Sequence, residues 1–375
     1  MADRISTLPD EVHSHILSFL PTQNAITTSV LSKGWKPLWR SVPTLFFDDQ
    51  TYLINDKPYD SFSKFIYRTI LNRDMQKPIT SFRLQCGHSN FNLSDSDVTT
   101  WVNAAMQSGI ENLHIELPSS SDPVRLRSSS IFSCKTLVVL KLIALDVDVF
   151  SISDLPFLKT LHLDYVEFRG PNYLMKLLSG CPVLEDLRLT RIYCAGSDSP
   201  RPSNKNLKSL SKLVRADIFR IGPNFALKVI CNVEFLRIDK YPDADDNPVF
   251  PNLTHVELMF GTGMNWDLVL AMLKNWPKLQ KLSLDMVESD TDMVWNSPFN
   301  VPECLFSQLR KCSITNYSGT ESEQQFAKYM MKNSGVLQTM TICTACSSKL
   351  QDKFEMLKEL SSCPRSSAIC ELLFK

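Results

Sequence analysis

A short apolar pattern recurs along most of this chain of 375 residues. The pattern is L-x-x-L-x-L, with other apolar residues also allowed at the leucine positions, and clear examples are LVVLKL, LKTLHL, LEDLRL and LQKLSL. Eleven matches begin at residues 79, 110, 137, 158, 184, 213, 233, 253, 279, 309 and 337. Successive starts lie 20 to 31 residues apart. Because repeats of this length are single supersecondary units, the chain is expected to fold as a stack of similar units.

Each match has the features of a short strand with one buried face. Its last two apolar residues alternate with a polar residue, which is the period of a β-strand. Between the strands, helical spacing that ends at Gly, Pro or Asn occurs within residues 98–115, 173–189, 268–284 and 326–342. Parallel strands joined by helical returns at this period are typical of leucine-rich repeats and predict a curved solenoid, or horseshoe. The expected fold class is therefore α/β.

The polar residue between the last two apolar positions is expected on the concave face of such a horseshoe. Across the eleven strands these residues are Arg83, His114, Lys141, His162, Arg188, Asp217, Arg237, Glu257, Ser283, Ser313 and Thr341. The first half of this row is mostly basic. Such a row is either a solvated face or a binding site for an acidic or phosphorylated substrate segment. On the second interpretation the candidate substrate-binding residues are Arg83, His114, Lys141, His162, Arg188 and Arg237.

The composition limits the classes of partner that are expected and the cellular compartment in which the protein is expected. Forty Lys plus Arg balance forty Asp plus Glu, so no overall field attracts nucleic acid or an anionic membrane, and neither is an expected partner. No stretch approaches 18 consecutive apolar residues, and the start lacks the features of a secretory signal. The eleven cysteines are expected to be reduced thiols. We therefore expect an intracellular protein of the cytoplasm, the nucleus or both.

Enzymatic interpretations fail on their spacing. The segment FGTGMNWDLVLAML at residues 260–273 resembles a dinucleotide-binding turn, but bulky Trp266 stands where a third glycine is needed for close helix packing. Cys343 and Cys346 form one CxxC pair, and no second pair follows at zinc-finger spacing. No HExxH, GxSxG or P-loop motif is present. We expect no cofactor, no metal and no catalytic residues.

The N-terminal segment carries more aromatic surface than so short a stretch can bury. Pro9 and the acidic residues after it predict a helix start, and an apolar face leads to Pro21, where the helix is expected to stop. Beyond it, Trp35 and Trp39 stand four residues apart and are expected to share one helical face. About forty residues cannot bury both rings, so the face needs the repeats or a second protein.

These residues carry a family resemblance. Residues 3–39, DRISTLPDEVHSHILSFLPTQNAITTSVLSKGWKPLW, resemble a plant F-box, with Gly34 and Val12 departing from the residues usual there. Residues 301–375 resemble the FBD region of plant F-box proteins through VPECLFSQLRKCSITNYSG and KELSSCPRSSAICELLF. The chain is thus similar to the F-box/FBD/leucine-rich-repeat family. The predicted domains are an F-box at 1–49, leucine-rich repeats at 50–300, and an FBD region at 301–375 that continues and caps the solenoid.

The resemblance implies a non-catalytic substrate receptor of a Skp/cullin/F-box ubiquitin ligase. Its F-box docks on the Skp adaptor, which connects it to cullin, and its repeats capture a protein substrate. An alternative is an F-box scaffold or small-molecule co-receptor that binds the adaptor without promoting degradation. By matching motif positions, the residues that face or support the adaptor are Leu8, Pro9, Ile16, Leu17, Leu20, Leu31, Ser32, Trp35, Leu38 and Trp39.

Overall fold

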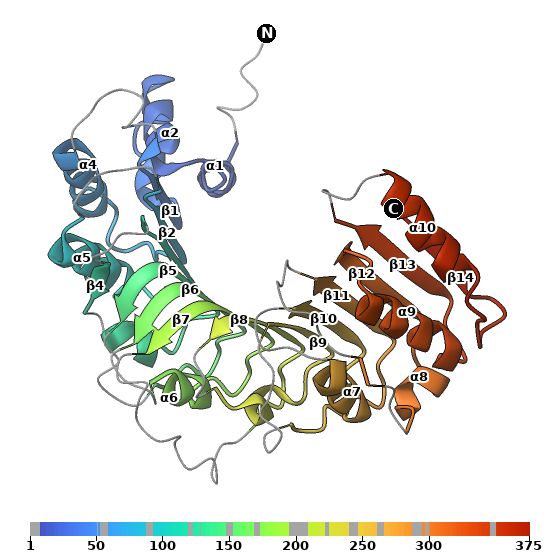
Figure 1. The fold of residues 1–375 in the computed structure, drawn as a ribbon. Helices are drawn as coiled ribbons and strands as arrows, with labels where there is room; N and C mark the ends of the chain where they lie inside the picture. The colour runs from blue at the N-terminus through green and yellow to red at the C-terminus, as the bar shows by residue number, and fades with distance from the viewer. Residues whose placement is uncertain are drawn as a thin grey trace. The chain divides into compact units, whose positions relative to one another are not determined.

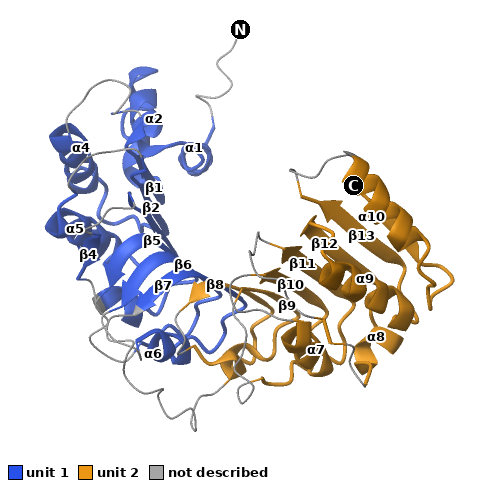
Figure 2. Ribbon diagram, in the orientation of Figure 1, with its two compact units in different colours: residues 1–203, 222–224 blue, residues 204–221, 225–375 orange. Residues whose placement is uncertain are grey.

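The computed structural model describes most of the chain. The described residues are 8–50, 52, 59–87, 93–118, 123–127, 129–147, 153–168, 173–194, 209–221, 225–239, 247–260, 266–286, 295–296, 300–345 and 350–375. Two compact units make up the structure: unit 1 is residues 1–203 with 222–224, and unit 2 is residues 204–221 with 225–375 (Figure 2).

Unit 1 begins with short helices and continues as a parallel sheet with helical returns (Figure 1). The helices that precede the sheet are α1 (Asp10–Leu17), α2 (Thr22–Thr27) and the 3₁₀ helices η1 (Thr28–Val30) and η2 (Leu38–Ser41). The strands are β1 (Thr44–Asp48), β2 (Ser81–Gln85), β3 (Asn112–Glu116), β4 (Val124–Leu126), β5 (Val139–Val147), β6 (Thr160–Phe168) and β7 (Asp186–Cys194). They are joined by α4 (Tyr59–Leu71), α5 (Asp95–Met106), η3 (Ser129–Ser133) and α6 (Tyr173–Ser179). The parallel order is β1-β2-β3-β5-β6-β7, and β4 pairs with β5.

Unit 2 has the same construction. Its strands are β8 (Arg215–Ile221), β9 (Phe235–Ile238), β10 (His255–Phe260), β11 (Lys281–Met286), β12 (Lys311–Tyr317), β13 (Thr339–Thr344) and β14 (Glu371–Phe374). They are parallel and pair in sequence order. The connecting helices are η5 (Leu227–Ile230), α7 (Trp266–Lys274), α8 (Glu303–Ser307), α9 (Glu321–Asn333) and α10 (Leu350–Ser361).

All eleven predicted strands are present, each beginning two residues after the start of its match. The structure adds two strands that carry the same pattern, β1 and β14. VPTLFF begins at Val42 and ICELLF begins at Ile369, so both were readable from the sequence. Strand β1 was not predicted because its residues fall inside the predicted F-box domain, residues 1–49.

The four predicted helices are confirmed as α5, α6, α7 and α9, and a further helix, α10, carries Phe354, Leu357 and Leu360. Figure 1 shows α4, α5 and α6 along one side of the unit 1 sheet, and α7 to α10 along one side of the unit 2 sheet. The second leucine-type position of each strand faces these helices. Leu113, Leu140 and Leu187, for example, are completely buried. Parallel strands with helices on one face are the architecture predicted for the repeats, whereas a single horseshoe across both units stays a prediction.

A left-handed residue recurs at one position of the repeat. It comes three residues after the predicted row of polar residues and takes φ angles between 48° and 58° in five strands: Ala144, Tyr165, Arg191, Arg220 and Asn316. None is glycine, although this region favours glycine. At three of the five positions a neighbouring carboxylate accepts a hydrogen bond from this residue: Asp239 from the Arg220 backbone N–H at 2.9 Å, Asp164 from the Arg191 side chain and Asp285 from the Asn316 side chain.

Candidate adaptor and substrate surfaces

The N-terminal helices enclose a small hydrophobic core. It is made of buried side chains with two partly buried ones against them: Leu17, Ala25, Trp35, Leu38 and Val42, with Leu20 and Trp39. Helix α1 ends at Leu17 and does not reach Pro21, contrary to the prediction. The backbone turns at Ser18–Leu20, and this turn brings Leu20 against the core while it sends Phe19 into solvent.

The two tryptophans do not share a helical face, and the expectation that they would is wrong. Trp35 lies in the turns of residues 33–37, and Trp39 lies in the short helix η2 that follows. Because no continuous helix joins them, their four-residue spacing does not place them on one face. Trp35 is buried and lies 4.9 Å from the His13 ring, measured between centroids. Trp39 is partly buried at the edge of the core and lies beside the Arg40 guanidinium. The N-terminal segment therefore buries most of this aromatic surface by itself.

A second set of apolar side chains points away from that core. Their exposed fractions lie between 37% and 84%, and the set comprises Leu8, Val12, Ile16, Phe19, Val30 and Leu31. Val12 and Ile16 are four residues apart and so lie on one face of α1, while Leu8 precedes the helix and its N-cap, Pro9. Several large apolar side chains left exposed within one short segment favour an interaction surface. We call these six residues the apolar face of the F-box.

The ten residues predicted to serve the adaptor therefore divide into two groups. Five are exposed and can contact a partner directly: Leu8, Pro9, Ile16, Leu31 and Ser32. The other five belong to the internal core: Leu17, Leu20, Trp35, Leu38 and Trp39. Of these, Leu17, Trp35 and Leu38 are buried and can act on a partner only by holding the first group in place, whereas Leu20 and Trp39 are partly buried. Val12, Phe19 and Val30 were not among the predicted residues, although their apolar character was a signal for them.

Hydrogen bonds fix the F-box segment to the first strand of the sheet. The Thr44 hydroxyl donates to the Ser18 carbonyl at 2.9 Å, and the Phe46 backbone N–H donates to the Thr22 hydroxyl at 2.8 Å. The buried guanidinium of Arg73 donates to the carbonyls of Val42 and Pro78. Burial lowers the pKa of Arg73. Since these bonds join three separate segments, the apolar face is held on a rigid support.

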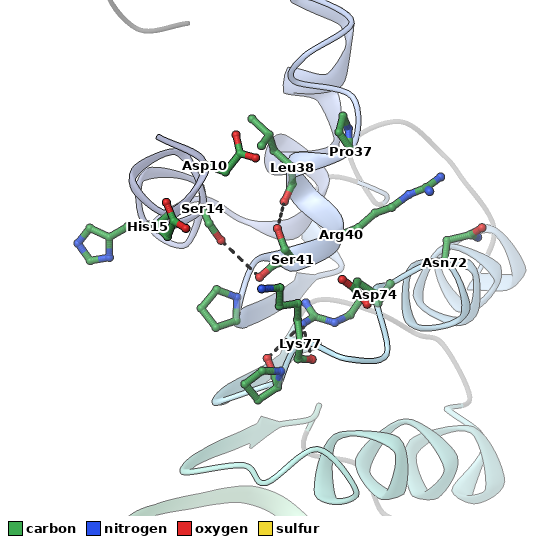
Figure 3. A pocket seen from close by; sticks show the side chains of 14 residues that line it. Asp10, Ser14, His15, Pro37, Leu38, Arg40, Ser41, Asn72, Asp74 and Lys77 are labelled. Carbon is green, nitrogen blue, oxygen red and sulfur yellow. Dashed lines mark hydrogen bonds between the residues drawn. The ribbon is translucent and has the colours of Figure 1, made fainter. Parts of the chain in front are cut away.

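A cleft of about 880 Å³ lies between α1, η2 and the loop after α4 (Figure 3). Its lining carries acidic side chains from α1 and the loop and basic side chains from η2 and the loop: Asp10, Glu11, Asp74, Arg40, Arg73 and Lys77. A hydrogen bond of 3.4 Å from the Ser14 hydroxyl to the Ser41 carbonyl crosses it. Small-molecule sites are mostly apolar. The cleft is a polar junction between the F-box and the first repeats.

The predicted polar row is a true structural row within each unit. In unit 1 the paired positions on successive strands are Phe46, Arg83, His114, Lys141, His162 and Arg188. In unit 2 they are Asp217, Arg237, Glu257, Ser283, Ser313, Thr341 and Leu373. The structure thus brings five of the six predicted substrate-binding residues together, and Arg237 belongs to the other unit. We call the sheet face that carries the row, opposite the helices, the open face.

Acidic neighbours change the character of the row. The Arg237 guanidinium lies 4.0 Å from Asp217 and 3.7 Å from Glu257, so two carboxylates balance its charge. The His162 Nε2 atom lies 3.1 Å from an Asp186 carboxylate oxygen. Arg237 and His162 therefore each have an acidic neighbour, and the two carboxylates beside Arg237 come from its predicted neighbours in the row.

Two further residues form a strong contact that the sequence pattern did not reveal. Arg191 in β7 donates to Asp164 in β6 at 2.8 Å, and its guanidinium carbon lies 3.8 Å from the centre of the Tyr165 ring. Tyr165 and Arg191 both occupy the recurring left-handed position of the repeat. Their spacing after the row was the only available signal, and it becomes readable only when the strands are aligned.

His114 lies at the centre of the basic part of the row. Burial, and then the positive charges of Arg83 and Lys141 and the His162 ring, lower the pKa of His114 to about 4. The imidazole is consequently neutral near pH 7. Arg83 donates to the Gln85 side-chain oxygen at 2.9 Å and lies 4.7 Å from the centre of the Phe46 ring. The positive charge of this part of the row therefore comes from Arg83 and Lys141.

The described residues include no cluster of three or more His, Cys, Asp or Glu that could hold a metal ion. Cys346 of the CxxC pair lies outside the described residues. Trp266 is completely buried at the start of α7, and residues 261–265 of the glycine-containing segment also lie outside the described residues. No helix among the described residues is both long and apolar enough to cross a membrane.

An N-terminal helical segment, repeats of strand and helical return, and a C-terminal segment that continues them define an F-box protein with leucine-rich repeats. Family models match all three parts. Residues 5–47 match the F-box domain, residues 98–218 match the leucine-rich repeats of FBD-associated F-box protein At5g56370, and residues 297–342 match FBD. The chain belongs to the F-box/FBD/leucine-rich-repeat family.

Full-length relatives support this assignment. FBD-associated F-box protein At5g56370 of Arabidopsis thaliana is 32% identical over 435 aligned positions, which cover 99% of this chain and 100% of the relative. FBD-associated F-box protein At4g10400 of the same plant is 33% identical over 421 positions, with 99% and 100% covered. A chain in the crystal structure of the yeast Rad7 and Elc1 complex aligns with 73% of this chain and 88% of its own length, at 14% identity and a TM-score of 0.32.

Proposed function

We propose that this protein is the substrate-recognition subunit of a Skp/cullin/F-box ubiquitin ligase. The F-box family implies binding to a Skp-type adaptor, and the repeats provide a surface for a protein substrate. The observation that carries the proposal is the apolar face of the F-box. Its six side chains are left exposed although the neighbouring core is complete. No catalytic role is assigned to the chain.

The chemistry of docking follows from this face. A helix that lays apolar residues at intervals of four into a partner's groove is a recurring mode of recognition. Burying an aliphatic side chain completely stabilises a complex by about 1.5–3 kcal/mol. Ile16 on α1 and Leu31 after η1 are well placed for this, because neither is needed to close the internal core. The core residues keep α1 at a fixed orientation.

Co-purification with a Skp adaptor and cullin tests the docking step. An Ile16→Asp variant places a charge in the apolar face and is expected to abolish co-purification, because the desolvated carboxylate has no partner there. A matched control is Leu71→Asp, which changes an equally apolar residue that is 77% exposed at the end of α4. If Ile16→Asp and Leu71→Asp retain the adaptor equally, the docking assignment is wrong.

Substrate capture and degradation require a separate test. The Ile16→Asp variant keeps both sheets intact and cannot hand a bound protein to the ligase, so affinity purification with it enriches substrates. Deleting residues 1–49 is less suitable, because it also removes β1, which pairs with β2. A captured partner that accumulates on proteasome inhibition supports the ligase. A partner whose abundance does not respond supports the alternative, a scaffold or small-molecule co-receptor that binds the adaptor without degradation.

We place the complex in the cytoplasm, the nucleus or both. Nine cysteines of the described residues are free thiols, and burial raises the pKa of Cys181 and of Cys304 to about 12. Unpaired, packed thiols suit a reducing compartment. Microscopy of a fluorescent fusion together with the adaptor checks this placement, and exclusive secretion or organelle import would contradict it.

A further inference from the structure

We propose that Arg83, His114 and Lys141 form a seat for one carboxylate or phosphoryl group on an acidic segment of the substrate protein. The inference rests on the proposed function, because it names the chemistry of the captured substrate. Arg83 in β2 pairs with His114 in β3, and His114 pairs with Lys141 in β5. Neighbouring strands lie about 4.8 Å apart. The three side chains therefore stand side by side on the open face of unit 1.

The two cations of this seat differ from others in the row. Among the residues that the structure describes, neither Arg83 nor Lys141 lies within ion-pair distance of a carboxylate. Arg237 occupies the same row position in unit 2, yet two carboxylates lie within 4.0 Å of it. His162 has Asp186 as a partner. Positive charge without a protein counter-ion is thus concentrated around His114.

Two polar atoms in the seat lack hydrogen bonds. Arg83 Nε and His114 Nε2 are buried, and within the described structure neither has a hydrogen-bond partner. The closest carboxylate to the imidazole is Glu116, whose Oε2 atom is 3.7 Å from His114 Nε2, beyond hydrogen-bond distance. Buried polar groups are normally satisfied. An oxyanion placed between Arg83 and His114 can accept from Nε and from Nε2, while the Lys141 ammonium balances its charge.

Binding of an anion is coupled to protonation of His114. The charges facing this imidazole are Arg83 on β2, Lys141 on β5, His162 on β6 and Glu116 on its own strand. The positive neighbours oppose a further positive charge on the ring. A bound anion offsets them, raises the pKa of His114 and favours the doubly protonated ring, which donates from both nitrogens. Affinity therefore increases as pH falls.

The surroundings favour a single anionic group over a polyanion. Asp48 and Glu116 each lie two residues after the row residue of their strand, and so on the same sheet face. Asp186 lies two residues before the row residue of its strand. These carboxylates repel the closely spaced phosphates of a nucleic acid. Phe46 stands next to Arg83 in the row, 4.7 Å from its guanidinium carbon. A protein segment with one acidic side chain followed by an apolar one fits this arrangement.

Fluorescence anisotropy on the full chain in complex with its Skp adaptor tests the seat. Three labelled probes are used: a serine peptide with one glutamate followed by a leucine, the same peptide with phosphoserine in place of the glutamate, and a single-stranded oligonucleotide. We expect at least one peptide to bind, and Arg83→Gln or Lys141→Gln to weaken it by about tenfold, as loss of a charge-assisted contact does. Arg237→Gln is the matched control, because its cation is already paired, and it should stay within about twofold.

Several results would overturn the proposal. These are failure of both peptides to bind, equal binding by wild type and the Arg83→Gln and Lys141→Gln variants, or tighter binding of the oligonucleotide through these same residues. The adaptor is measured in every sample. Loss of peptide binding with the adaptor retained separates failure of the seat from failure of the proposed function, since the docking residues lie outside the row.

Peptide affinity measured over a range of pH values distinguishes a binding role for His114 from a structural one. Peptide affinity is expected to rise between about pH 7.5 and pH 5.5, and His114→Gln should remove that rise while keeping binding at the higher pH. His162→Gln should leave the rise in place, because its ring already has Asp186 as partner. A pH dependence that survives His114→Gln and disappears in His162→Gln would contradict the assignment.

Discussion

The ring of Trp266 in α7 stacks on the ring of Phe326 in α9, with centroids 4.3 Å apart and planes 19° apart. Both side chains are completely buried. Trp266 belongs to the leucine-rich region, and Phe326 belongs to the segment 301–375 that resembles an FBD region. The Phe260 ring at the end of β10 lies 5.0 Å from the same indole. In unit 2, therefore, the C-terminal segment shares one hydrophobic core with the repeats before it.

Removal of residues 301–375 is expected to destabilise unit 2, because it strips the stacking partner from Trp266 and exposes the edge of β11. The milder change Phe326→Ala should lower the free energy of unfolding by about 3–5 kcal/mol, as large truncations in a core do. Urea unfolding of the wild type and the variant measures this difference in the free energy of unfolding. The control is Phe306→Ala, which shortens a ring that is 70% exposed. A truncated chain that melts like the full one would make the segment a detachable module.

The repeat fold was predictable because each strand carries the same pattern of apolar residues, which marks its buried face. Leu140, Leu161 and Leu187 occupy the same position and pair across strands, so one pattern repeated along the chain defines many contacts. The turn after that pattern was not predictable. Left-handed residues such as Ala144 and Arg191 are not glycines, and only cross-strand alignment shows that they are equivalent.

The sequence could predict which residues belong to the candidate surfaces, but not which of those residues are exposed to solvent. Every apolar residue of the F-box segment fits an adaptor contact equally well in the sequence. The structure separates Trp35 inside the core from Leu31 at the surface because α1 ends at Leu17 and the chain turns back on itself. The sequence places Asp217 and Glu257 in the same row as Arg237, but only the structure shows that their carboxylates lie within 4.0 Å of its guanidinium.

Gly180 is expected to tolerate no side chain. A Cβ atom at this position would lie 2.2 Å from the Ser153 carbonyl oxygen, and the backbone there is held by a 2.9 Å bond from the Leu155 N–H to the Gly180 carbonyl. Gly180→Ala should therefore destabilise unit 1, with overpacking costs of about 1–3 kcal/mol or more. Thermal unfolding measures the change. Gly87→Ala is the control, because nothing lies within 4 Å of its Cβ position; equal melting temperatures for both variants would contradict the close approach.

Stability should depend on pH through His114. Its pKa is lowered from 6.5 to about 4 in the folded chain, so the unfolded chain binds more protons between these values. The contribution is fully present above about pH 6.5 and is lost as pH falls toward 4. His114→Gln should flatten the pH dependence of the melting temperature in this window. His255, whose pKa is also lowered by burial, serves as a comparison; an unchanged slope in His114→Gln would rule out His114 as the source.

Trp35 and Leu31 are expected to affect adaptor binding by different routes. Trp35→Ala leaves a cavity in the F-box core and should destabilise that segment by about 3–5 kcal/mol, so adaptor binding is lost together with local structure. Leu31→Asp changes a side chain that is 66% exposed and should reduce adaptor affinity at least about tenfold without changing stability. Hydrogen exchange of α1 amides, measured beside adaptor affinity, separates the two effects. Trp35→Ala with α1 protection intact and binding abolished would instead make the indole a direct adaptor contact.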